Sequence, residues 1–117
     1  SKELSGLVAL ASFSAADQLA PSVRVDQSWF AVSPRKYERF LQEIDGKEVE
    51  SGANVQVILA DDYVFQNLSP AHSPIPCTSP VQTYWDLIAS GGRGEEAADT
   101  ILEECLLPQW KQHGIVS

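Results

Sequence analysis

Two adjacent aspartates, Asp61 and Asp62, have the residue types and the position best suited to chemistry in this chain. They follow an apolar run at 54–60 that favours a buried strand, and carboxylates at the end of such a strand are typical Mg²⁺ ligands in nucleases. With Glu50 as a third ligand, they would form a small Mg²⁺-dependent nuclease-like site. The acid-x-Lys step that such sites use stands before the pair here, at 45–47. A solvated turn that begins a loop explains the double aspartate better.

The soft metal ligands are two histidines and two cysteines, namely His72, His113, Cys77 and Cys105. No two of them have the Cys-x-x-Cys or His-x-x-x-His spacing that places two ligands on one turn or face. We therefore predict no metal centre and no cofactor. A Cys–His nucleophile would need a fold that brings the two groups within hydrogen-bond reach, and the sequence gives no sign of it. Cys105 suits a helix core, and Cys77 suits an exposed or edge position in a proline-rich loop.

A glycine-rich stretch at 91–94 contains Arg93 and resembles a phosphate-binding loop at a helix N-terminus. A helix precedes it instead of a strand, and the two glutamates that follow, Glu95 and Glu96, would repel a phosphate. We interpret it as a connector between two helices, in which Arg93 pairs with Asp86 or with the glutamates.

The helix before this connector is strongly marked. Ser79 is a suitable N-cap and Pro80 suits the first helical position. Apolar side chains recur with helical spacing, at Val81, Tyr84, Trp85 and Ile88. Tyr84 and Trp85 are adjacent and cannot both point into the core, so we expect one of them at the rim of a groove or partner interface. Gln82 and Asp86 share another face, and we expect one of them to bond the loop at 69–78 or the glycine turn. The candidate binding residues are Gln82, Tyr84, Trp85, Asp86 and Arg93.

The remaining pattern predicts an α+β fold with a mostly antiparallel sheet packed by three to four helices. The expected strands lie within 22–32, 47–60 and 63–77. The expected helices are 34–44, 80–90 and 94–107, with a further helix or two within 4–20 and Pro108 stopping or restarting the last one. Short connections, including a turn at 51–53 and another near 26–28, favour antiparallel pairing.

Length and composition indicate one globular domain over residues 1–117, with 44% hydrophobic and 21% charged residues. Sixteen acidic against eight basic residues give a net charge of −8. This balance argues against direct contact with nucleic acid, because that affinity is built largely from Lys and Arg. No apolar run reaches the ~20 residues of a membrane span. No secretory signal is recognisable and only two cysteines occur, so we expect a reduced, cytoplasmic protein.

The pattern Ser-Pro-Val-Gln-x-Tyr-x-Asp-Leu at 79–87, followed by Gly-Arg-Gly-Glu-Glu-Ala-Ala at 92–98, resembles the C-terminal part of the AbiEi family. A Gly-Ala-Asn-Val stretch at 52–55 resembles a Gly-Gly-Asn-Val turn and strand of that family, from which Ala53 departs. Val64-Phe65 resembles a short apolar step before the Ser-Pro helix. The order of these pieces agrees from about 52 to 104, while the first 50 residues match loosely.

Members of the AbiEi family are antitoxins and transcriptional regulators of type IV toxin–antitoxin systems. The resemblance implies a non-catalytic antitoxin or regulatory domain, with a nucleotidyltransferase-like toxin that it counteracts without a stable complex. Full-length members carry an N-terminal winged helix that we do not find in this chain. The resemblance therefore implies the C-terminal, non-DNA-binding domain of a longer protein, with the winged helix fused or encoded upstream. The alternatives are the nuclease-like enzyme and a generic protein-interaction domain.

Overall fold

In the computed structural model of this chain, helices pack on a small sheet. The structure describes residues 7–20, 27–46 and 55–115. In chain order the elements are β1 (Val8–Leu10), α1 (Ser12–Leu19), β2 (Ser28–Val32), the 3₁₀ turn η2 (Pro34–Lys36), α2 (Tyr37–Gly46), β3 (Val55–Leu59), α3 (Asp62–Gln66), α4 (Pro80–Ser90), α5 (Arg93–Ile101), the π-helical turn η4 (Leu102–Leu106) and α6 (Leu107–Gln112). The α+β class predicted from the sequence is confirmed.

The sheet has the strand order β1-β2-β3 and is mixed. β1 is antiparallel to β2, with Val8 opposite Val32, whereas β2 is parallel to β3, with Val32 opposite Leu59. The mostly antiparallel sheet expected from the sequence is corrected here. Parallel neighbours need a long crossover connection, and η2 with α2 supplies it between β2 and β3. The segment around 51–53, expected to be a hairpin turn, lies outside the described residues.

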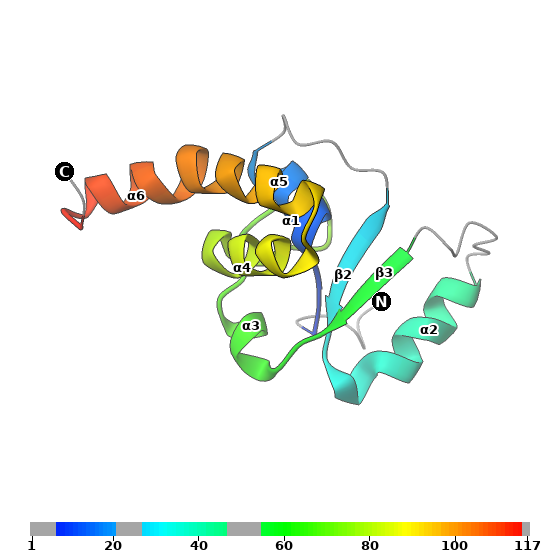
Figure 1. Cartoon of the computed structure of the whole chain (residues 1–117). Coiled ribbons are helices and arrows are strands. Elements are labelled where there is room, and N and C mark those ends of the chain that lie inside the picture. Colours follow the sequence, from blue (N-terminus) through cyan, green and yellow to red (C-terminus); the bar gives the residue numbers. More distant parts are fainter. Residues whose placement is uncertain (1–6, 21–26, 47–54, 116–117) are drawn as a thin grey trace.

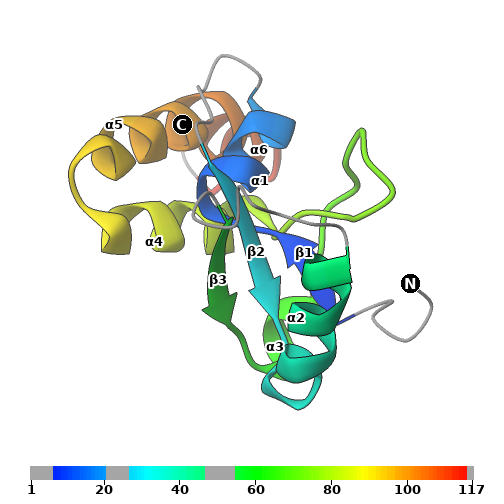
Figure 2. The same cartoon turned by 90° about the vertical axis from the view of Figure 1, so that its right-hand side faces the viewer.

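Helices lie on both sides of the sheet (Figures 1 and 2), and each side has its own hydrophobic cluster. The first lies among α1, α4, α5 and η4, where Ala16, Leu87 and Ile101 are buried. The second lies between the sheet and α2, where Val8, Val32 and Phe40 are buried and the Phe30 and Phe40 rings are 5.3 Å apart. The sheet thus separates α2 from the helical unit that carries most of the candidate residues.

The beginnings of two predicted helices are confirmed by their capping geometry. Ser79 Oγ accepts a hydrogen bond from the Gln82 N–H at 3.2 Å, with Pro80 next to it. Ser33 Oγ accepts from the Arg35 N–H at 3.4 Å, and Pro34 opens η2, which leads into α2. In both places a proline occupies a position where its missing N–H costs no helical hydrogen bond.

The N-terminal segment differs from the expected helix within 4–20. Residues Val8–Leu10 form β1 against β2, and the helix begins only at Ser12. Ser12 has φ +48°, a left-handed conformation that is costly for a residue with a Cβ. This residue turns the chain sharply from β1 into α1. Of the strand expected within 22–32, the described part is extended from Ser28 onward, while residues 21–26 lie outside the described residues.

The segment expected to be extended at 63–77 is a strand in only a small part. Tyr63 to Gln66 lie in the short helix α3, which corrects that prediction. Further on, the chain pairs beside β1: the Leu10 N–H donates to Pro76 O at 2.8 Å, and the Thr78 N–H donates to Leu10 O at 2.9 Å. The short extended piece ending at Cys77 is thereby confirmed, and it leads directly into the cap of α4.

The C-terminal helix continues beyond the predicted end at 107. Pro108 cannot donate a backbone hydrogen bond and its ring crowds the preceding turn, and the π-helical turn η4 stands just before it. The helix then restarts as α6, which projects past the start of α4 (Figure 1). Of the two outcomes weighed for Pro108, a stop or a restart, the structure has the restart.

Candidate functional site

Helix α4 carries the aromatic pair singled out in the sequence. Trp85 is 60% exposed, whereas Tyr84 is half-buried and packs against the helical cluster. Their rings meet edge to face, with centroids 5.6 Å apart and planes 79° apart. Of the two, Trp85 is the residue that points to solvent, and its place at the rim of a groove or partner interface stays a prediction. One turn before it, Val81 is 45% exposed, so an apolar side of α4 faces solvent.

Gln82 and Asp86 form a half-buried polar pair on a different side of α4. Gln82 Nε2 donates to Asp86 Oδ1 at 3.0 Å. The pair is bonded to itself, not to the loop or glycine turn that the sequence suggested as partners. Burial raises the pKa of the Asp86 carboxyl, and the hydrogen bond from Gln82 opposes part of this rise. The hydrogen bond therefore joins two residues of the same helix and links α4 to no other element.

Arg93 lies at the start of α5 and contacts the N-terminal part of the chain. Its guanidinium carbon is 5.8 Å from the centre of the Phe13 ring. The Phe13 ring in turn lies against Trp29, with centroids 5.5 Å apart and planes tilted by 48°. This cation–π contact ties the α4–α5 turn to α1 and β2. Phe13 was not predicted as a partner of Arg93, because the sequence separation hides the contact. The five candidate residues therefore divide among an exposed tryptophan, a half-buried tyrosine, an internal polar pair and a cation–π contact.

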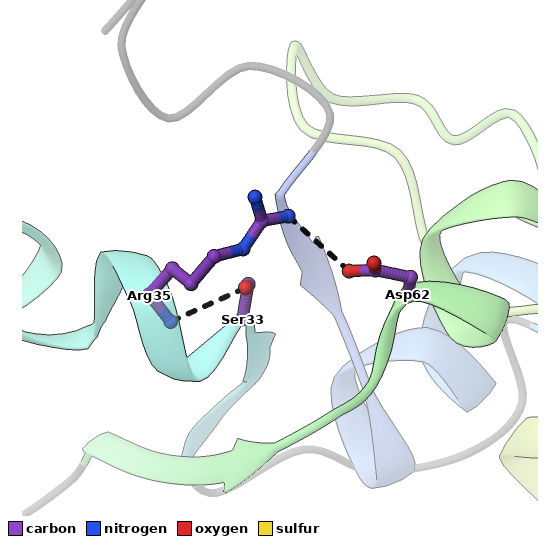
Figure 3. Close-up of polar contacts among 3 residues, drawn as sticks. All are labelled: Ser33, Arg35 and Asp62. Atoms are coloured by element: carbon purple, nitrogen blue, oxygen red, sulfur yellow. Dashed lines mark hydrogen bonds and ion pairs between the residues drawn. The ribbon is translucent and has the colours of Figure 1, made fainter.

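The aspartate pair is exposed at the start of α3. Asp62 Oδ1 lies 3.3 Å from Arg35 Nη2, and both side chains are 68% exposed (Figure 3). Asp61 occupies the N-cap position of α3 without a side-chain capping bond. Glu50, the third ligand of the nuclease-like hypothesis, lies outside the described residues. Across the described ranges, no group of three or more His, Cys, Asp or Glu side chains is arranged to hold a metal ion. The observed partner of Asp62 is thus an arginine.

The cysteines occupy apolar surroundings and are both free thiols. Cys77 Sγ lies 3.7 Å from Pro70 O, and Cys105 Sγ lies 3.6 Å from Leu19 O. Cys77 is buried, in contrast to the exposed or edge position expected from the sequence, because the bridge to β1 places it inside. Burial raises the pKa of both thiols, which keeps them protonated and poor nucleophiles at neutral pH.

Three buried hydroxyl groups were not singled out in the sequence. Thr78 Oγ1 and Thr83 Oγ1 are 2.7 Å apart and link the end of the bridging segment to the first turns of α4. Ser12 is fully buried, and its Oγ has no hydrogen-bond partner among the described residues. Serine and threonine are common enough that their spacing gives no signal. Only the positive φ and the burial of Ser12 distinguish it.

The comparison with known protein families matches residues 1–107 to the family described as "Transcriptional regulator, AbiEi antitoxin, Type IV TA system". The chain belongs to this AbiEi antitoxin family. No curated protein and no solved structure matches it. The resemblance carried by the Ser-Pro helix is confirmed, and the match extends over the first 50 residues as well.

The part of this AbiEi chain that matches the family contains the whole α4–α5 unit and ends at the first residue of α6. The capped helix, the polar pair and the exposed Trp85 therefore all lie within the matched region. Of the helices that the structure describes, none is long and apolar enough to cross a membrane.

Proposed function

We propose that this chain is a non-catalytic, regulatory domain of an AbiEi-type antitoxin and acts in the cytoplasm. The family match over residues 1–107 carries the proposal. The charge of the chain supports the regulatory part of it. With a net charge of −8, the domain offers few cations to phosphates, so DNA contact falls to another part of the protein. We propose a winged helix, fused to this domain or encoded upstream, for that role.

The proposed toxin is a nucleotidyltransferase-like protein that the antitoxin counteracts without a stable complex. The test is co-expression in bacteria of this chain with the nucleotidyltransferase-like protein encoded beside it. The chain, alone or joined to its winged helix, should restore growth, and the two proteins should not co-purify. A Leu87→Asp variant, which places a charge in the buried helical cluster, should lose the rescue, whereas the exposed Tyr63→Ser change should keep it. Growth arrest in the presence of the longer antitoxin would overturn the proposal.

The non-catalytic part has its own test. The purified chain should leave single- and double-stranded nucleic acid intact in millimolar Mg²⁺, and Mg²⁺ should not change its melting temperature, because ligand binding would raise it. Cleavage that Asp62→Ala abolishes would instead favour the nuclease-like alternative.

A further inference from the structure

Strand β3 has the sequence of a buried strand but lies at the edge of the sheet. Its residues 55–59, Val-Gln-Val-Ile-Leu, are almost continuously apolar, a pattern typical of strands buried on both faces. Yet β3 is the outermost strand in the order β1-β2-β3 (Figure 2), none of its side chains is buried, and Leu59 is 55% exposed. Edge strands are usually protected by charges, prolines or bulges. β3 contains no charge and no proline, and its register with β2 is continuous.

The pairing with β2 identifies the backbone groups on the outer side of β3. The Ala60 N–H donates to Val32 O at 3.0 Å, so Ala60 directs its backbone groups toward β2. Successive residues of a strand alternate in this direction. Val55, Val57 and Leu59 therefore direct their N–H and C=O groups away from β2, where the described part of the chain offers them no hydrogen-bond partner. Unpaired groups in such a row are a template for another strand.

The opposite edge of the sheet is different. Beside β1, the Leu10 N–H donates to Pro76 O and the Leu10 carbonyl accepts from the Thr78 N–H, so a later segment of the chain continues the pairing. At β3 the described ranges contain no strand that plays this part. One edge of the sheet is therefore covered by the chain itself, and the other presents a pairing surface.

We propose that β3 pairs with β3 of a second copy of this chain, antiparallel and centred on Val57, in a symmetric dimer. Val57 then faces Val57 of the copy, and Val55 faces Leu59 of the copy. Each facing pair exchanges two backbone hydrogen bonds, and the exposed Leu59 side chain gains a cross-strand neighbour. This dimer goes beyond the proposed function, which names no assembly, and its test does not depend on toxin neutralisation.

Symmetry and charge favour a second copy in this orientation. The outward residues are spaced evenly about Val57, so the strand matches itself in the reverse direction, as a two-fold interface requires. β3 has no charge, so the acidic surplus of the chain is not concentrated at the contact. Asp61 and Asp62 follow the strand, and antiparallel pairing places them at opposite ends of the paired strands. Parallel pairing in register would instead bring these like charges together.

The test combines sedimentation of the purified chain over a range of concentrations with amide hydrogen exchange measured residue by residue. We expect a monomer–dimer equilibrium. The outward amides of Val55, Val57 and Leu59 should be protected at high concentration and should exchange rapidly on dilution. The Ile58 amide, which faces β2, should be protected at both concentrations and serves as the internal control.

Matched variants separate pairing at this edge from association elsewhere on the chain. Leu59→Pro removes an outward N–H, which an edge strand tolerates, and should raise the Kd of the dimer at least about tenfold. Leu59→Lys places a charge at the edge and should have the same effect. Ile115→Lys makes the same change in charge at an exposed aliphatic residue outside the sheet and should leave the Kd unchanged.

Circular dichroism distinguishes a folded monomer from an unfolded chain, and Leu59→Lys decides if Leu59→Pro does not fold. A chain that stays monomeric up to millimolar concentration would overturn the proposal. So would outward amides that are protected in the monomer, because another segment would then cover the edge. A dimer with an unchanged Kd in the folded Leu59 variants would place the contact elsewhere and would also overturn it.

Discussion

Gly94→Ala tests the close packing of α4 against α5. A Cβ at this position would overlap the carbonyl oxygen of Leu87 and lie 3.2 Å from the Cβ of Ser90. Because the obstacle is backbone, no side-chain rotation relieves it, and α5 must move away from the buried Leu87. Overpacking of this kind costs about 1–3 kcal/mol, and the better helix propensity of alanine offsets at most about 1 kcal/mol. We expect a net loss of about 1–2 kcal/mol and a melting temperature lower by about 4–8 °C.

The measurement is thermal and urea unfolding followed by circular dichroism, with Glu95→Ala as the matched control. Glu95 is the next residue and is exposed, so its replacement should change stability by no more than about 0.5 kcal/mol. Gly91→Ala adds a second comparison, because Gly91 has φ +67° and open space around the added Cβ, which isolates backbone strain from overlap. If the melting temperature of Gly94→Ala equals or exceeds that of Glu95→Ala, α4 and α5 do not approach as closely as described.

Two further changes test the buried polar groups. Ser12→Gly relieves the φ of +48° and removes a hydroxyl that has no partner among the residues the structure describes, so it should stabilise the protein by about 1 kcal/mol. Ser12→Ala removes the hydroxyl alone. A lower melting temperature in both variants would mean that the hydroxyl has a hydrogen-bond partner. Burial raises the pKa of the Asp86 carboxyl above 3.8, so the folded protein holds the carboxyl proton more tightly than the unfolded chain does. Ionisation of Asp86 therefore lowers the stability of the fold as pH rises from 3.8 through the raised pKa. Asp86→Asn keeps an acceptor for Gln82 and cannot ionise. The melting temperature of Asp86→Asn minus that of the original protein should therefore increase over this rise in pH. A difference that stays constant with pH would contradict the raised pKa.

The helix starts at Ser33-Pro34 and Ser79-Pro80 were predictable because capping depends on residues that are adjacent in sequence. A serine hydroxyl reaches an N–H two or three residues later whatever the rest of the fold does. The glycine turn was predictable for the same reason, since Gly91 and Gly92 both adopt positive φ between two helices. These features need no information about distant parts of the chain.

Three of the errors concern pairing between distant segments. Val8–Leu10 was placed in a helix because its apolar residues fit helical spacing, but the contact with β2 decides its conformation. The parallel pairing of β2 with β3 depends on α2 serving as a crossover, and residue types do not encode that direction. The burial of Cys77 likewise follows from its bridges to β1 and Ser69. Tertiary contacts override local preference in each case.

The family pattern on α4 and the exposed apolar side of this helix carry different information. In Ser-Pro-Val-Gln-x-Tyr-x-Asp-Leu, Ser79 caps the helix, Gln82 and Asp86 bond each other, and Leu87 fills the helical cluster. The pattern thus consists mainly of residues that build and dock the helix, while Trp85 stands at an unspecified position.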